Sequence, residues 1–179
     1  VSDYQNHRLL RFAAAHSVTT NQVNAVQVLG QANFISAGAS TTLNGLNQPH
    51  GLNLDAAGRL WVADFGNNRV VRFDNAASLG NGGNAAAVLG QPNFTANGAS
   101  LTQSGMSQPV TLTLDAAGNL YVGDFNANRV LRFNNAAAKP NGANADGVLG
   151  QTLFTTNGAA ATATGMNAPG GVTVSPAGD

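Results

Sequence analysis

The sequence contains no cysteine and no glutamate, and only 9% of its 179 residues are charged. The lack of cysteine excludes a disulfide framework and a thiol nucleophile. The formal net charge of zero gives no electrostatic reason to expect nucleic acid as a partner. No apolar run approaches the length of a membrane span, and no signal peptide is visible. We therefore expect neither nucleic acid nor a membrane among the partners.

The residues that are abundant are small or polar, chiefly Gly, Ala, Asn, Ser and Thr, and Lys139 is the single lysine. A surface of this composition favours an extracellular or cell-envelope protein over a cytosolic one. The sequence does not begin with methionine, so we expect a mature product or a fragment.

A strict internal repeat organises the chain. The motif Val-Leu-Gly-Gln begins at Val28, Val88 and Val148, which are spaced sixty residues apart. A fixed period of this length is typical of solenoids and propellers. The repeat therefore has to be interpreted before any single residue.

Each unit consists of short apolar runs separated by Gly, Asn, Asp and Pro, a pattern that indicates strands and turns. In the central unit we predict strands over 50–54, 59–65, 69–73 and 85–89, and a turn over 55–58. No sustained helical period occurs. The fold class is therefore all-β, and a long Gly/Ala/Ser/Thr/Asn loop follows each fourth strand.

The central unit resembles the NHL repeat in three segments, which are Gly51–Asp55, Leu60–Asp64 and Asn68–Val70. Residues 6–9, Asn-His-Arg-Leu, resemble the turn of the same family. The resemblance implies a β-propeller of four-stranded blades, with three blade equivalents in one domain over 1–179. Residues 1–30 then supply strands two to four of a blade, 50–90 and 110–150 supply whole blades, and 170–179 supply a first strand. The units are longer than the usual NHL repeat, through the loop after the fourth strand.

The two ends of the sequence lie in phase with each other. Residues 175–179 align with 115–119, and Val1 aligns with Val122. Three blades leave apolar faces and strand edges open, whereas propellers close with about four to eight blades. We therefore expect a homodimer that closes a six-bladed ring, in which the C-terminal strand of one copy completes the first blade of the other.

Three aspartates each precede an arginine by five residues, across the second turn of the repeat. The pairs are Asp3 with Arg8, Asp64 with Arg69, and Asp124 with Arg129. Because every copy has the pair, an ion pair or an Asp-capped turn that stabilises the blade is expected, rather than a catalytic role.

Residues that break the repeat are better candidates for function. The strand that lines the channel of a propeller begins with His50, Val110 or Gly170 in the three units, each after a proline. His50 is the only titratable side chain of the three. It is therefore the candidate ligand at the channel mouth, although a hydrogen-bonded structural histidine is the alternative.

Three functions remain open. The leading hypothesis is a non-enzymatic binding or scaffold module that engages a protein or glycan with its variable polar loops. A second is a hydrolase or lyase with a metal in its channel, as in relatives of NHL propellers; however, the sequence shows no metal-ligand cluster, no cofactor motif and no Gly-x-Ser-x-Gly nucleophile. A third is a propeller fragment with no activity of its own.

Overall fold

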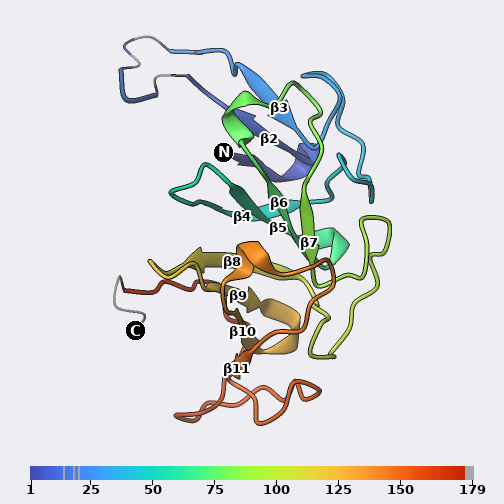
Figure 1. Ribbon diagram of the computed structural model, residues 1–179, viewed down its shortest axis with the longest axis vertical. Helices are drawn as coiled ribbons and strands as arrows, with labels where there is room; N and C mark the ends of the chain where they lie inside the picture. Colours follow the sequence, from blue (N-terminus) through green and yellow to red (C-terminus); the bar gives the residue numbers. More distant parts are fainter. Residues whose placement is uncertain (14, 18, 20, 176–179) are drawn as a thin grey trace.

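The computed structural model describes residues 1–13, 15–17, 19 and 21–175 as three antiparallel sheets stacked along its long axis (Figure 1). The first sheet has three strands, and its order is β1 (Ser2–Asp3), β2 (Arg8–Arg11) and β3 (Gln27–Leu29). The second is β4 (Pro49–Leu54), β5 (Leu60–Asp64), β6 (Arg69–Phe73) and β7 (Ala87–Leu89). The third is β8 (Pro109–Leu114), β9 (Leu120–Asp124), β10 (Arg129–Phe133) and β11 (Gly147–Leu149).

The helical segments of the described chain are single 3-10 turns between strands, which agrees with the all-β prediction. They are η1 (Tyr4–Asn6), η2 (Ala15–Ser17), η3 (Phe65–Asn67), η4 (Ala76–Ser78), η5 (Phe125–Ala127) and η6 (Ala136–Ala138). Within the described ranges, no helix has the length and apolarity needed to cross a membrane.

The predicted turn over 55–58 forms between β4 and β5. The backbone N–H of Gly58 donates to the carbonyl of Asp55 over 3.0 Å, and Gly58 adopts a φ of 76°. The Asp55 carboxylate also accepts the N–H groups of Ala57 and Arg59, each over 3.0 Å. Asp and Gly therefore act here as the sequence predicts, since one bonds the local backbone and the other supplies the positive φ.

Apolar side chains fill the two spaces between neighbouring sheets. Between the first and second sheets, the core includes Leu9, Leu29, Leu46 and Val88. Between the second and third, it is a cluster of twelve buried residues that includes Trp61, Met106, Leu131 and Phe133. The second sheet thus buries both faces, and the first and third sheets each bury one, by the face-to-face packing that stabilises propeller blades.

The inner strands of successive sheets approach closely at Gly51. A Cβ atom at this position would lie 2.9 Å from the Cα atom of Thr111 and 2.9 Å from the carbonyl oxygen of Val110. Only glycine permits this contact without a backbone shift. The lack of a side chain at Gly51 therefore lets β4 pack directly against β8.

Residues 170–175 form no strand, although the sequence predicts a first strand over 170–179. A strand is defined by ladder hydrogen bonds to a neighbour, and no other described strand pairs with this segment. Residues 176–179 lie outside the described part of the chain. The strand over 170–179 therefore stays a prediction.

Candidate functional site

The central unit contains a buried ion pair at the junction of β5, η3 and β6. Asp64 ends β5, Arg69 begins β6, and the two residues are directly opposite in the ladder. Asn68 closes the intervening turn with a left-handed φ of 52°. Arg69 Nε lies 2.7 Å from Asp64 Oδ2, and both side chains are fully buried. Local turn geometry therefore brings these two side chains together.

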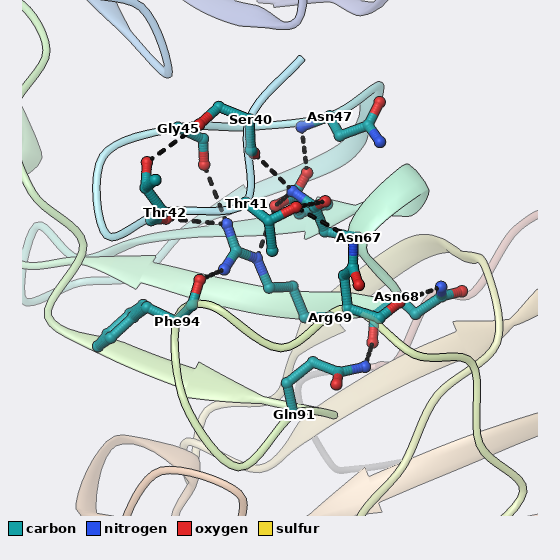
Figure 2. Close-up of polar contacts among 12 residues, drawn as sticks. Ser40, Thr41, Thr42, Gly45, Asn47, Asn67, Asn68, Arg69, Gln91 and Phe94 are labelled. Carbon is teal, nitrogen blue, oxygen red and sulfur yellow. Dashed lines mark hydrogen bonds and ion pairs between the residues drawn. The ribbon is translucent and has the colours of Figure 1, made fainter.

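The arginine of this pair also binds two loops (Figure 2). Its Nη1 donates to the carbonyl of Phe94 over 2.6 Å, in the loop that follows its own sheet. Its Nη2 donates to the carbonyls of Thr42 and Gly45 over 3.1 and 3.0 Å, in the loop that precedes its sheet. Arg69 thereby ties together two successive units.

The same preceding loop also binds the aspartate. The N–H of Asn47 donates to Asp64 Oδ1 over 2.7 Å. Asn67 donates to Asp64 Oδ2 over 2.8 Å. It also donates to the carbonyl of Ser40 over 2.9 Å, as Figure 2 shows. We call this loop, residues 40–47, and its counterparts 100–107 and 160–167 the joint loops.

The third unit repeats the arrangement. Arg129 Nε lies 2.8 Å from Asp124 Oδ2, and both side chains are fully buried. Arg129 Nη2 donates to the carbonyl of Gly105 over 2.9 Å, and the N–H of Ser107 donates to Asp124 Oδ1 over 2.6 Å. Arg129 Nη1 bonds the carbonyl of Phe154. We call the contact between an Asp–Arg pair and the joint loop that covers it a joint. The joints at Asp64 with Arg69 and at Asp124 with Arg129 are therefore built alike.

The first unit has the pair, but no joint loop of the described chain lies against it. Arg8 Nε lies 2.7 Å from Asp3 Oδ2, but the side chains are 17% and 25% exposed. Arg8 Nη1 bonds the carbonyl of Phe34 in the following loop. The Asn6 amide donates to both carboxylate oxygens of Asp3, over 2.9 and 3.0 Å. The pair predicted from sequence forms in all three units, and its burial differs.

Burial also separates the pKa values of the carboxyl groups. Loss of solvent raises the pKa of Asp124 to about 6 and raises that of Asp64, even though each carboxylate faces an arginine. At Asp3, burial acts in the same direction but is outweighed by hydrogen bonds from Arg8 and Asn6, so its pKa is lowered. The same residue type therefore titrates differently in open and closed joints.

His50 lies between two aromatic rings. Its ring centroid is 4.6 Å from that of Tyr4 and 4.8 Å from that of Phe65. Burial lowers the pKa of His50. Among the described residues, its side chain has no hydrogen bond or ion pair, while Val110 is partly buried on β8 and Gly170 is exposed. Aromatic packing thus occupies much of the His50 ring, and a ligand role at the channel mouth stays a prediction.

His7 occupies the position of Asn68 and Asn128, and each of the three residues accepts a backbone hydrogen bond from the next unit. Gln48 N donates to His7 Nδ1 over 3.0 Å, Gln108 N to Asn68 Oδ1 over 2.8 Å, and Ala168 N to Asn128 Oδ1 over 2.7 Å. All three residues have φ values between 50° and 52°. His7 is therefore a structural substitute for asparagine.

The glutamine of the Val-Leu-Gly-Gln motif has a structural role that we did not assign from sequence. Gln91 Nε2 donates to the carbonyls of Asn68 and Gly98, over 2.9 and 2.8 Å. Gln31 and Gln151 make the equivalent pairs of bonds. The sixty-residue spacing of this motif was the available signal. The long loops are consequently held against the sheets by repeated side chains.

The described aspartates are committed to bonds within the frame. Six form ion pairs, and Asp115 accepts from the backbone and side chain of Asn119, each over 2.8 Å. No group of three His, Asp or Glu residues within the described ranges has the spacing of a metal site. His50 lies against aromatic rings instead of other donors. The described His and Asp residues therefore do not fit a channel metal.

Repeated antiparallel sheets packed face to face are the arrangement of β-propeller blades. Residues 46–73 match the NHL repeat family, which confirms the resemblance seen in the sequence. Among solved structures, one titled "Streptogramin B lyase structure" is 19% identical to the chain, with a TM-score of 0.33. The match covers 49% of this chain and 24% of that one. The search of curated proteins found no match.

Proposed function

We propose that the chain is a non-enzymatic binding or scaffold module, an arc of propeller blades that a second copy completes into a six-bladed ring. The observation that carries this proposal is the exposure of apolar side chains on the two outer faces of the stack. At one face, Leu149 is 54% exposed, whereas its counterparts Leu29 and Leu89 are buried between sheets. Apolar faces of this kind mark interaction sites.

The other outer face shows the complementary feature. Phe34 is 39% exposed, whereas its counterparts Phe94 and Phe154 pack against the two hydrophobic clusters. A second copy would place its Leu149 face against this Phe34 face. Six is the multiple of three within the usual range of about four to eight blades, so two copies form a ring of ordinary size.

Sedimentation equilibrium at micromolar concentration tests the assembly. We expect twice the mass of one chain, because closing the ring buries both outer faces in two identical joints. A stable monomer over this concentration range would overturn the proposal.

The binding role is supported by the contrast between a bonded frame and exposed loop residues. The described aspartates, and the arginines other than Arg132, bond within the frame, whereas Ile35 and Leu153, in the loops after β3 and β11, are 93% and 61% exposed. Loops on a rigid scaffold are common binding elements. We propose a protein or glycan ligand for them, and an extracellular or cell-envelope location.

An array of glycans and proteins, probed with the assembled protein, tests the binding role. We expect one class of ligand to be retained by the wild type and lost after Ile35→Ser and Leu153→Ser are combined. Retention of no ligand would count against binding and would leave the assembly proposal intact.

A further inference from the structure

The open ion pair of the first unit lacks bonds that both closed pairs make. Arg69 Nη2 binds the carbonyls of Thr42 and Gly45, and Arg129 Nη2 binds those of Thr102 and Gly105, over 2.9 to 3.4 Å. Within the described chain, Arg8 Nη2 has no such acceptor, although Arg8 Nε and Nη1 are bonded as in the other units. One half of a joint is therefore assembled at this end of the stack.

The other half is assembled at the opposite end. In joint loop 160–167, the N–H of Ala160 donates to the carbonyl of Met166 over 3.1 Å. Ser40 with Leu46 and Ser100 with Met106 make this bond in the two occupied joint loops, each over 3.0 Å. The loop thus has the bound shape without an arginine on it among the described residues.

Joint loop 160–167 is also more exposed than its two counterparts. Leu46 and Met106 are fully buried in their joints, whereas Met166 is only partly buried. The carbonyls of Thr162 and Gly165 correspond to those that Arg69 and Arg129 bind. The carbonyl acceptors of joint loop 160–167 and the Nη2 donor of Arg8, which has no such acceptor in the described chain, therefore lie at opposite ends of the stack.

We propose that Asp3 and Arg8 of one copy bind joint loop 160–167 of a second copy. Arg8 Nη2 donates to the carbonyls of the partner's Thr162 and the partner's Gly165, and the N–H of the partner's Asn167 donates to Asp3. This inference rests on the proposed assembly and specifies its contacts. The second copy is the occupant because its loop repeats the donors and acceptors of both internal joints, position by position.

The proposed contact would also place the partner's chain beside the edge strand β1. In the closed units, Pro49 pairs with Asp64 and Pro109 with Asp124 at the start of β4 and β8. The equivalent pairing places the partner's Pro169 opposite Asp3. The partner's residues 170–175 would then extend the first sheet by strand addition, in which backbone hydrogen bonds supply much of the affinity.

The dimer dissociation constant of Arg8→Ala tests the contact, with Arg11→Ala as the matched control. Arg11 lies on the same strand, carries the same charge, and bonds Gln27 within its own sheet over 2.8 Å. We expect Arg8→Ala to weaken the dimer about a hundredfold, since the ring has two joints and a charged hydrogen-bond donor is worth about tenfold at each. Arg11→Ala should change the constant by less than about threefold.

A dimeric wild type in which both variants dissociate alike would overturn the contact and leave the assembly standing. A monomeric wild type would overturn both. Circular dichroism of each variant establishes that the fold is retained.

Cysteine trapping gives a second readout that does not depend on affinity, because the chain has no native cysteine. In the central joint, Thr41 Oγ1 lies 2.7 Å from Asn67 Oδ1, and the counterparts across the proposed joint are Asn6 and the partner's Ala161. Asn6→Cys combined with Ala161→Cys should oxidise to a covalent dimer. The internal pair Leu101→Cys with Ala127→Cys is the control and should close within one chain. A dimer that is not trapped by the first pair, while the control pair closes, would contradict the proposed contact.

Discussion

The first unit and the central unit contain the same ion pair in two environments. Asp3 with Arg8 and Asp64 with Arg69 have the same spacing, the same ladder register and the same 2.7 Å separation. The central pair is fully buried, and the first pair is partly exposed. The difference arises outside the pair, because joint loop 40–47 covers Asp64 and Arg69. An inter-unit contact thus converts a local turn into a buried network.

The largest difference between the two environments is expected when the arginine is removed, as in Arg69→Ala and Arg8→Ala. Removing Arg69 leaves a buried carboxylate and three loop carbonyls without their donor, so the free energy of unfolding should fall by about 3–5 kcal/mol. Arg8→Ala, measured by urea unfolding at a dilution where the chain is monomeric, should lose about 1 kcal/mol or less. Equal losses would show that loop closure does not set the strength of the pair.

The pH dependence of stability should also differ between the environments. The folded pKa of Asp124, about 6, lies above its ordinary value of 3.8, so the folded chain binds an extra proton between about pH 4 and 6. Acidification through this window therefore favours folding, by about 3 kcal/mol for this group. The lowered pKa of Asp3 has the opposite sign, so its contribution is present above about pH 4 and is lost as the pH falls further.

Urea unfolding of the wild type and Asp124→Asn at pH 7, 6, 5 and 4 checks the sign. The stability of the wild type relative to the variant should increase as the pH decreases. A constant or decreasing difference would show that burial does not raise the pKa of Asp124.

The two internal joints should respond alike to loss of an asparagine. Asn81 Oδ1 accepts the N–H of Val28, and Asn141 Oδ1 accepts that of Val88, each over 3.0 Å. Asn81→Ala and Asn141→Ala each leave the backbone N–H of a buried valine without its acceptor, which costs about 1–3 kcal/mol. Thermal or urea unfolding should give similar losses for both, and less than about 0.5 kcal/mol for the exposed control Asn126→Ala. Unequal losses would show that the joints differ in strength.

The smallest effect is expected at the position where the first unit has histidine. Asn accepts the same backbone bond at 68 and 128 and tolerates the left-handed φ. His7→Asn should therefore change the free energy of unfolding by less than about 0.5 kcal/mol, whereas His7→Ala should lose about 1 kcal/mol. A large loss for His7→Asn in the same urea assay would show that the imidazole ring has a role beyond accepting this bond.

Much of the sheet structure could be predicted from the sequence, because turn residues and strand alternation act over a few positions. The predicted strand over 69–73 matches β6 exactly in its bounds, and the turn over 55–58 forms with Asp55 and Gly58 in their expected roles. The fourth strand is shorter than predicted, since β7 covers 87–89 instead of 85–89. Ala85 instead donates to the carbonyl of Leu43 in a joint loop, a partner from the preceding unit.

The candidate site was less predictable, because many of its contacts join residues far apart along the chain. The Asp–Arg pairs are five residues apart, so their geometry follows from one turn. The contact of His50 with Tyr4 joins different units, and its contact with Phe65 joins β4 to η3 within one unit. Nothing in the repeat pattern indicates either contact. Gln91 and Arg69 hold the long loops to the frame, and the sequence did not indicate these bonds.

By itself, the sequence determined the repeat length, the strand order within a unit and the pairing of each aspartate with its arginine, because these depend on turns and ladders within sixty residues. Tertiary structure alone decided which pairs are buried, which loops act as joints and which apolar faces stay open. Burial depends on what the neighbouring unit places against a residue, and similar repeats differ in their neighbours. The first unit, with its uncovered arginine, is where that difference is greatest.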